Sequence, residues 1–354
     1  MIETFKAFVI DKDESGKVTP TFKQLSPTDL PKGDVLIKVH YSGINYKDAL
    51  ATQDHNAVVK SYPMIPGIDL AGTIVESEAP GFEKGEQVIV TSYDLGVSHY
   101  GGFSEYARVK SEWIIKLPDT LTLEESMIYG TAGYTAGLAI ERLEKVGMNI
   151  EDGPVLVRGA SGGVGTLAVL MLNELGYKVI ASTGKQDVSD QLLELGYKVI
   201  ASTGKQDVSD QLLELGAKEV IDRLPVEDDH KKPLASSTWQ ACVDPVGGEG
   251  INYVTKRLNH SGSIAVIGMT AGNTYTNSVF PHILRGVNIL GIDSVFTAMK
   301  LRQRVWRRLA KDLMPENLHE IKQVITFDEL PEQLNKVIKH ENKGRIVIDF
   351  GVDK

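Results

Sequence analysis

The most informative chemical pattern is a glycine-rich turn between an apolar run and a helix-forming run. The stretch VLVRGASGGVG places four glycines directly after a predicted strand and at the start of a predicted helix. Glycines allow a tight turn without Cβ atoms in the way, and the first N–H groups of the helix then point at a pyrophosphate. The pattern favours a dinucleotide site, with a purely structural turn as the alternative. The candidate cofactor-binding residues here are Ser161, Gly162, Gly163 and Val164.

The next predicted strand ends in VIASTGK, without a carboxylate at its tip. An NAD site usually has an Asp or Glu about 20 residues after the glycines, to bind the ribose hydroxyls. Hydroxyls and a cation at this place suit the extra phosphate of NADP, although a solvated lysine in a surface turn is the alternative. The candidates for this contact are Ser182, Thr183, Gly184 and Lys185, with Arg223 further along the chain.

A 20-residue segment follows the glycine turn twice without change, as 177–196 and 197–216. Ser182 of the first copy lies 17 residues after Gly165, whereas Ser202 of the second lies 37 residues after it. We therefore expect the first copy to form the cofactor site and the second to be extruded or to add a peripheral element. Either copy could present an equivalent strand. Complete identity indicates a recent duplication, an engineered insertion or a sequence error.

Elements around the turn alternate between strands and helices from about Leu121 onward. Nearly continuous apolar runs such as WQACVD and GSIAVIG are typical of buried parallel strands, so the pattern predicts an α/β fold with a Rossmann-type, doubly wound parallel sheet. Residues before Leu121 form short β-branched runs separated by Gly, Pro and Asp, which predict a β-rich domain. We expect domains at 1–124 and 125–295, with 296–354 rejoining the first.

Composition excludes several classes of protein. The net charge of −9 argues against general binding to nucleic acid or anionic membranes, because both depend on basic patches. Cys242 is the only cysteine, so the chain has no intramolecular disulfide and no multi-cysteine zinc site; within an apolar run, it is interpreted as a core residue. Without a signal peptide or a long apolar run, the sequence predicts a soluble cytoplasmic protein.

Several long motifs occur in a fixed order along nearly the whole chain. They are SGINYKDAL, PMIPGIDLAGTI, TSYDLGVSHYGGFSEYARV, YGTAGYTA, GASGGVG, VDPVGG, ILRGVNILGIDSV and GRIVI. Together they resemble the medium-chain dehydrogenase/reductase superfamily, most closely its zinc-free branch of quinone oxidoreductases and acrylyl-CoA reductase-like proteins. The resemblance implies that the β-rich domain is GroES-like and that the protein is a homodimer acting on a small molecule. The duplicated segment is the one clear departure.

The resemblance also bears on metal chemistry. Zinc alcohol dehydrogenases of this superfamily have a His-Glu pair where PGIDLAG of this chain has Ile68 and Asp69. The N-terminal domain also lacks cysteine, so the usual catalytic zinc cannot be assembled there. A nicotinamide enzyme without a metal can still reduce a carbon–carbon double bond conjugated to a carbonyl. We therefore expect NADPH-dependent reduction of small enoyl thioesters or enones, with quinone reduction or NADPH binding without turnover as alternatives.

The catalytic candidates lie in INYKD. By resemblance, Tyr46 contacts the nicotinamide end of the cofactor and could donate a proton, Asn45 could orient a carbonyl, and Asp48 could fix Lys47 or order water. A turn-shaping role is the alternative for Tyr46 and Asn45.

The remaining candidates are cofactor contacts. Thr131 and Thr135 resemble residues near the nicotinamide, with helix capping as the alternative. Gly268 and Met269 follow a predicted strand, where such contacts collect. Arg345 could meet the cofactor or the phosphates of a thioester, or be an ordinary surface charge like Arg223. The RQRVWRR cluster is interpreted as a solvated helix face rather than a coenzyme A site.

Overall fold

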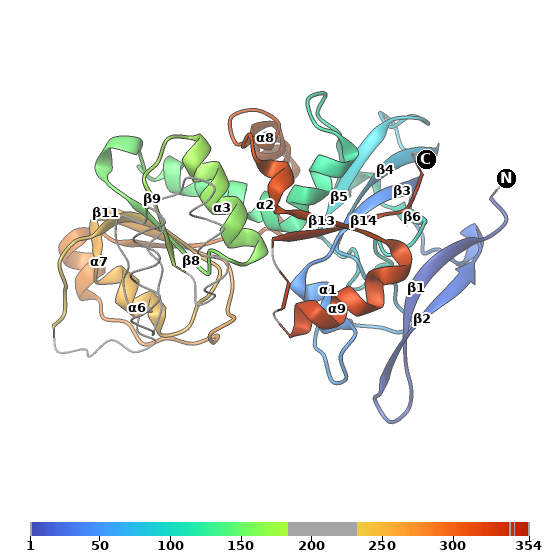
Figure 1. Ribbon diagram of the computed structural model, residues 1–354, viewed down its shortest axis with the longest axis horizontal. Coiled ribbons are helices and arrows are strands. Elements are labelled where there is room, and N and C mark those ends of the chain that lie inside the picture. Colours follow the sequence, from blue (N-terminus) through green and yellow to red (C-terminus); the bar gives the residue numbers. More distant parts are fainter. Residues whose placement is uncertain (1, 183–231, 340, 343, 353–354) are drawn as a thin grey trace. The chain divides into compact units, whose positions relative to one another are not determined.

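The computed structural model describes residues 2–182, 232–339, 341–342 and 344–352 (Figure 1). Contacts divide the chain into two compact units. Unit 1 comprises Met1–Ala132, Ser294–Ala310 and Asn317–Lys354, and unit 2 comprises Gly133–Asp293 and Lys311–Glu316. The first division lies at 132/133, inside a helix, rather than at the 124/125 boundary expected from the sequence, because the first turns of that helix bond to unit 1.

Unit 1 contains a mixed seven-stranded sheet. Its strands are β3 (Val35–Gly43), β4 (Asp69–Ser77), β5 (Gln87–Thr91), β6 (Tyr106–Val109), β7 (Ile114–Lys116), β13 (Lys322–Thr326) and β14 (Arg345–Asp349). They lie in the order β13-β14-β3-β4-β5-β7, and β6 also pairs with β3. The C-terminal strand β14 pairs antiparallel with β3, so the end of the chain completes a sheet that the N-terminal residues begin.

The rest of unit 1 is a hairpin and three helices around an apolar core. These elements are β1 (Phe5–Lys12), β2 (Val18–Leu25), α1 (Tyr46–Ala51), α8 (Met299–Leu309) and α9 (Leu330–Ile338). In the core, the Phe22 ring lies 5.3 Å from that of Phe8 and 5.1 Å from that of Phe327, edge to face in both pairs. Aromatic packing of this kind joins the N-terminal hairpin to the C-terminal segment.

Unit 2 contains a five-stranded parallel sheet (Figure 1). Its strands are β8 (Val155–Arg158), β9 (Val179–Ser182), β10 (Trp239–Asp244), β11 (Leu258–Val266) and β12 (Asn288–Gly291), in the order β12-β11-β10-β8-β9. The helices are α3 (Gly163–Glu174), α6 (Gly250–Thr255) and α7 (Phe280–Arg285), and α2 (Leu123–Lys145) begins in unit 1 and ends here. The expected α/β fold with a parallel Rossmann-type sheet and a β-rich unit is confirmed.

The first repeat copy supplies the strand next to the glycine turn. β9 belongs to that copy and pairs parallel with β8, with Arg158 opposite Ser182. The second copy lies outside the described residues.

Two backbone features complete the fold. Helix α2 is kinked at Gly130, whose φ of +48° is a conformation that residues with a side chain rarely adopt. Among the described residues, no helix is both long enough and apolar enough to cross a bilayer.

Candidate functional site

The glycine turn of unit 2 joins β8 to α3 through backbone positions that exclude side chains. Gly159 has a φ of +58°, and a Cβ on Gly165 would lie 2.2 Å from the Gly159 carbonyl oxygen. Gly162 is exposed at the N-cap of α3. The first N–H groups of a helix have no partner within it, so those of Gly163 and Val164 are free to bind an anion. This cradle fits the pyrophosphate of a dinucleotide.

A buried ion pair links the strand that precedes the glycine turn to the neighbouring strand. Nη1 of Arg158, the last residue of β8, lies 2.6 Å from Oδ2 of Asp244, the last residue of β10. Oδ1 of Asp244 also accepts the N–H groups of Val246 (2.8 Å) and Gly247 (3.1 Å). Burial raises the pKa of Asp244, although Arg158 and these N–H groups act in the opposite direction. The pair ties two neighbouring strand ends together, and sequence reasoning missed Arg158.

Ser182, Gly268 and Met269, three predicted cofactor-binding residues of unit 2, lie at or just after the ends of strands at this edge of the sheet. The N–H of Ala160 donates to the carbonyl of Ser182 (3.0 Å), which places the end of β9 beside the turn. Gly268 packs against Pro245, since a Cβ there would lie 2.3 Å from the Pro245 carbonyl oxygen. Met269 follows, and its side chain is 69% exposed.

Other predicted cofactor contacts are placed elsewhere or not described. Thr135 is buried on α2 in unit 2. Thr183, Gly184, Lys185 and Arg223 lie outside the described residues.

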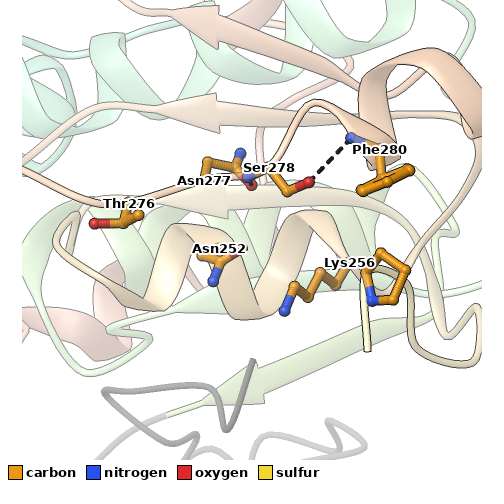
Figure 2. Close-up of a pocket in the computed structure, with 7 residues that line it drawn as sticks. Asn252, Lys256, Thr276, Asn277, Ser278 and Phe280 are labelled. Atoms are coloured by element: carbon orange, nitrogen blue, oxygen red, sulfur yellow. Dashed lines mark hydrogen bonds between the residues drawn. The ribbon is translucent and has the colours of Figure 1, made fainter. Parts of the chain in front are cut away.

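A cavity of about 440 Å³ lies elsewhere in unit 2, beside α6. Asn252 and Lys256 on the helix and Thr276 and Ser278 on a nearby segment are among the residues that line it (Figure 2). Among the predicted site residues that the structure describes, none lines this cavity. It is therefore separate from the glycine turn.

In unit 1 the buried carboxylate of Asp69 brings predicted site residues together. Its Oδ1 accepts the N–H of Gly43 (2.8 Å), and its Oδ2 accepts Nδ2 of Asn45 and the N–H of Thr131, each at 2.8 Å. The Asp69 side chain thus forms hydrogen bonds with the end of β3, the start of α1 and the kink of α2. The sequence signal was a carboxylate inside the apolar run GIDLAG, which we had considered only as a departure from zinc enzymes.

Asp48 is a positioning residue rather than a surface group. Its side chain is 1% exposed, and its oxygens accept the N–H groups of Asn45 (2.9 Å), Gly67 (3.1 Å) and Ile68 (2.9 Å). Burial, together with the charge of Asp69, raises the pKa of Asp48 to about 7. The expected role of Asp48, fixing Lys47 or ordering water, is not the one this geometry supports.

Arg345 is buried beside these carboxylates. Nε donates to the carbonyl of Ile128 (2.9 Å) and Nη1 to that of Ile44 (3.2 Å). Burial lowers the pKa of Arg345, while Asp69 and Asp48 act to raise it. Because its side chain is 3% exposed, Arg345 is not placed to meet a phosphate at the surface, contrary to the expectation from the sequence.

Tyr46 is exposed, in contrast to the neighbouring buried side chains of Asp69, Asp48 and Arg345. It is the first residue of α1 and 41% exposed. The amide of Asn45, the preceding residue, is used inside the fold, since Nδ2 binds Asp69 and Oδ1 lies 3.4 Å from Nη1 of Arg345. Tyr46 is therefore accessible to solvent, whereas the side chain of Asn45 holds the start of the helix.

The RQRVWRR cluster forms α8, and its arginines have different surroundings. Arg304 and Arg307 are exposed, as a solvated face predicts. Arg302 is fully buried: Nη1 donates to Thr91 (3.0 Å to O, 2.8 Å to Oγ1), and Nη2 donates to the carbonyls of Ser294 and Val295, each at 3.0 Å. The solvated-face interpretation was wrong for Arg302, which fastens two segments of unit 1.

Two further features concern possible metal ligands and the thiol of Cys242. In the part of the chain that the structure describes, no group of three or more His, Cys, Asp or Glu side chains is arranged to hold a metal ion. Cys242 is fully buried on β10, and burial raises the pKa of its thiol well above the usual value. It is a core residue, because a nucleophilic cysteine needs a lowered pKa and exposure.

Comparison with known families identifies both parts of the chain. Residues 31–119 match the alcohol dehydrogenase GroES-like domain, and residues 163–311 match the zinc-binding dehydrogenase family. These two matches coincide with the β-rich part of unit 1 and with most of unit 2.

Individual proteins are similar over nearly the full length. The acrylyl-CoA reductase AcuI of Ruegeria pomeroyi is 39% identical, with 98% of this chain and 99% of that protein covered. The crystal structure of Bacillus subtilis YhfP with NAD bound is 44% identical, with a TM-score of 0.87 and coverage of 98% and 99%; its name provisionally assigns it to the quinone oxidoreductases. The Salmonella enterica YhdH oxidoreductase in complex with NADP is 36% identical, with a TM-score of 0.85 and the same coverage.

Proposed function

Because this chain belongs to the medium-chain dehydrogenase/reductase family, in the subgroup of YhfP and AcuI, we propose that it is an NADPH-dependent reductase of small activated alkenes. The leading substrate class is an acrylyl-CoA-like enoyl thioester. The observation that carries the proposal is the glycine turn, together with near full-length similarity to an acrylyl-CoA reductase. Quinone reduction is the second candidate, favoured by the name of YhfP.

The cofactor would bind at the carboxyl edge of the unit 2 sheet. The N–H groups of Gly163 and Val164 would receive the pyrophosphate, and the Arg158–Asp244 pair would hold the surrounding loops in place. When bound, the nicotinamide supplies a hydride to the β-carbon of the alkene.

NADP is proposed over NAD because the sequence from Ser182, the last residue of β9, to Lys185 carries two hydroxyls and a cation but no carboxylate. We expect Lys185→Ala to weaken NADPH binding at least about tenfold, the loss of one charge-assisted contact, and to leave NADH binding unchanged. Fluorescence titration with both cofactors measures this. Lys205→Ala is the matched control in the second copy; if it produces the selective loss instead, the second copy forms the site.

The chemistry that the chain itself must supply is the proton for the α-carbon. Tyr46 is the proposed donor, because its phenol is exposed at the start of α1 while Asp69, Asp48 and Arg345 position the backbone beneath it. Asn45 and Thr131 would serve as positioning residues through their bonds to Asp69.

Tyr46→Phe should therefore lower kcat by about 100-fold, the usual contribution of a general acid, while changing the NADPH Kd less than about threefold. Steady-state rates and cofactor titration on the same preparation separate the two quantities. Unchanged turnover would remove Tyr46 as the proton donor.

A zinc-independent reaction is part of the proposal. Asp69 stands where zinc enzymes of the family carry their His-Glu pair, and its carboxylate is occupied by three N–H donors. The single cysteine, Cys242, is buried in unit 2. This set of donors does not fit a catalytic zinc.

The deciding experiment follows NADPH oxidation with acrylyl-CoA and a simple quinone, on chelator-treated protein of verified mass, and repeats it with NADH. Fast NADPH-selective turnover of the thioester supports the proposal. Turnover of the quinone alone favours the second candidate. Tight NADPH binding without turnover of either indicates a binding protein.

We also propose a homodimer formed at the β12 edge of the unit 2 sheet. β12 ends the sheet, and neighbouring α7 exposes the apolar side chains of Phe280 (47%), Ile283 (73%) and Leu284 (54%). Apolar surface beside an open strand edge favours pairing with a second copy.

Ile283→Asp should convert the dimer to a monomer in sedimentation velocity, because it places a charge in the proposed interface. Val324→Asp, at an exposed apolar position in unit 1, is the control and should leave the dimer intact. A monomeric wild-type protein would contradict the proposal.

A further inference from the structure

Phe296 is an exposed aromatic residue that the proposed chemistry has not used. Its side chain is 65% exposed. Among the described residues of unit 1, only Phe296 and Tyr46 are aromatic residues with this degree of exposure. An aromatic ring offers a large apolar contact surface, and a site is more precise when the backbone that carries it is rigid.

The backbone on both sides of Phe296 is held by hydrogen bonds. The carbonyl of Val295 accepts the N–H of Tyr93 (3.3 Å) and Nη2 of Arg302 (3.0 Å). The carbonyl of Thr297 accepts the phenol of Tyr93 (3.3 Å). Tyr93 and Arg302 therefore hold the backbone on both sides of Phe296 in a fixed position, an arrangement called here the Phe296 clamp.

The clamp depends on a strained turn. Ser92 (φ +66°) and Tyr93 (φ +52°) are consecutive residues with side chains in the left-handed region. Residues with side chains are strained in this region and persist there only where the surroundings hold them. Here the Tyr93 ring stacks on Trp113 (centroids 5.8 Å apart), and the guanidinium of Arg302 lies 4.4 Å from the same ring.

Strands β4 and β5 connect the Phe296 clamp with Asp69 and Asn45, which lie next to Tyr46. Thr91, two residues before Tyr93, is the register partner of Asp69 across β5 and β4. Asp69 in turn binds Asn45, the residue before Tyr46. Arg302 also bonds to Thr91 and to the carbonyl of Val295, so the strand pair connects the backbone next to Phe296 with the residue before Tyr46.

Building on the proposed alkene reductase, we propose that the Phe296 ring is an apolar wall of the substrate site and limits the size of the substituent on the β-carbon of the alkene. An acrylyl group has only hydrogen at that carbon, whereas longer enoyl groups carry an alkyl chain that the ring would obstruct. Phe296 is then a specificity-determining residue, and Tyr93 and Arg302 are its positioning residues.

The test measures kcat/KM of wild type, Phe296→Ala and Phe296→Leu with acrylyl-, crotonyl- and hexenoyl-CoA. We expect the hexenoyl/acrylyl ratio to rise at least about tenfold for Phe296→Ala and less for Phe296→Leu, because each methylene admitted to an apolar pocket changes discrimination by about 10- to 200-fold. The Kd for NADPH should stay the same. Val324→Ala, another exposed apolar position in unit 1, is the control.

The outcomes separate this inference from the proposed function. Wild-type protein that reduces no alkene overturns both. If wild-type protein reduces acrylyl-CoA but Phe296→Ala has the wild-type hexenoyl/acrylyl ratio of kcat/KM, only the proposed role of Phe296 is overturned. An unchanged ratio accompanied by a change in sedimentation coefficient would show instead that Phe296 belongs to a subunit interface.

Discussion

Arg345→Met should lower the free energy of unfolding by about 3–5 kcal/mol, the usual cost of removing one partner from a buried charge cluster. Asp69 is fully buried and Asp48 is 1% exposed, and Arg345 is the cation whose charge acts on both. Methionine has a similar length but no charge, so Asp48 and Asp69 lose the neighbouring cation. Urea denaturation at pH 8 measures the loss.

The loss should shrink as the pH falls from 8 through about 7, the pKa of Asp48. Without the cation, the pKa of Asp48 rises further, so its carboxyl is protonated at pH 5 and less unbalanced charge remains. A loss that is equal at pH 8 and pH 5 would indicate lost packing instead. Lys23→Met, which breaks the half-exposed pair with Asp11, is the control and should cost less than about 1 kcal/mol.

Gly165→Ala should weaken NADPH binding by roughly 100-fold, because displacing the turn by about 1 Å misaligns its N–H groups. The added Cβ would lie 2.2 Å from the carbonyl oxygen of Gly159 and 2.8 Å from Cα of Ala160, and both are backbone atoms that cannot rotate away. We expect a loss of stability of about 1–3 kcal/mol as well. Cofactor titration and thermal unfolding check the two effects.

Gly162→Ala is the informative comparison for that prediction. A Cβ at Gly162 meets only the carbonyl oxygen of Gly159, at 3.4 Å, and the residue is exposed. This variant should keep the wild-type melting temperature, so any loss of NADPH affinity would come from the Cβ obstructing the ligand. Equal affinity in wild type and Gly165→Ala would mean that the turn is structural only.

Local patterns were sufficient to determine much of this protein. The spacing of glycines in VLVRGASGGVG predicted the strand, turn and helix at 155–174, because backbone conformations open only to glycine leave a direct mark on the sequence. Continuous apolar runs predicted the parallel strands for a similar reason, since burial on both faces removes polar residues from them. The position of Ser182 relative to the glycines indicated which repeat copy pairs with β8.

Only the tertiary structure decided which charged residues are buried. Arg158, Asp69, Arg302 and Arg345 lie in short motifs where a solvated charge is the ordinary expectation, and each has a partner between 62 and 301 residues away in the chain. A sequence pattern carries periodicity over a few residues, but ion pairs and backbone contacts at such separations depend on how the sheets assemble. For the same reason, Asp48, expected as a catalytic residue, and Arg345, expected as a cofactor contact, are buried in the cluster next to Tyr46, and the backbone around Phe296 is held by Tyr93 and Arg302.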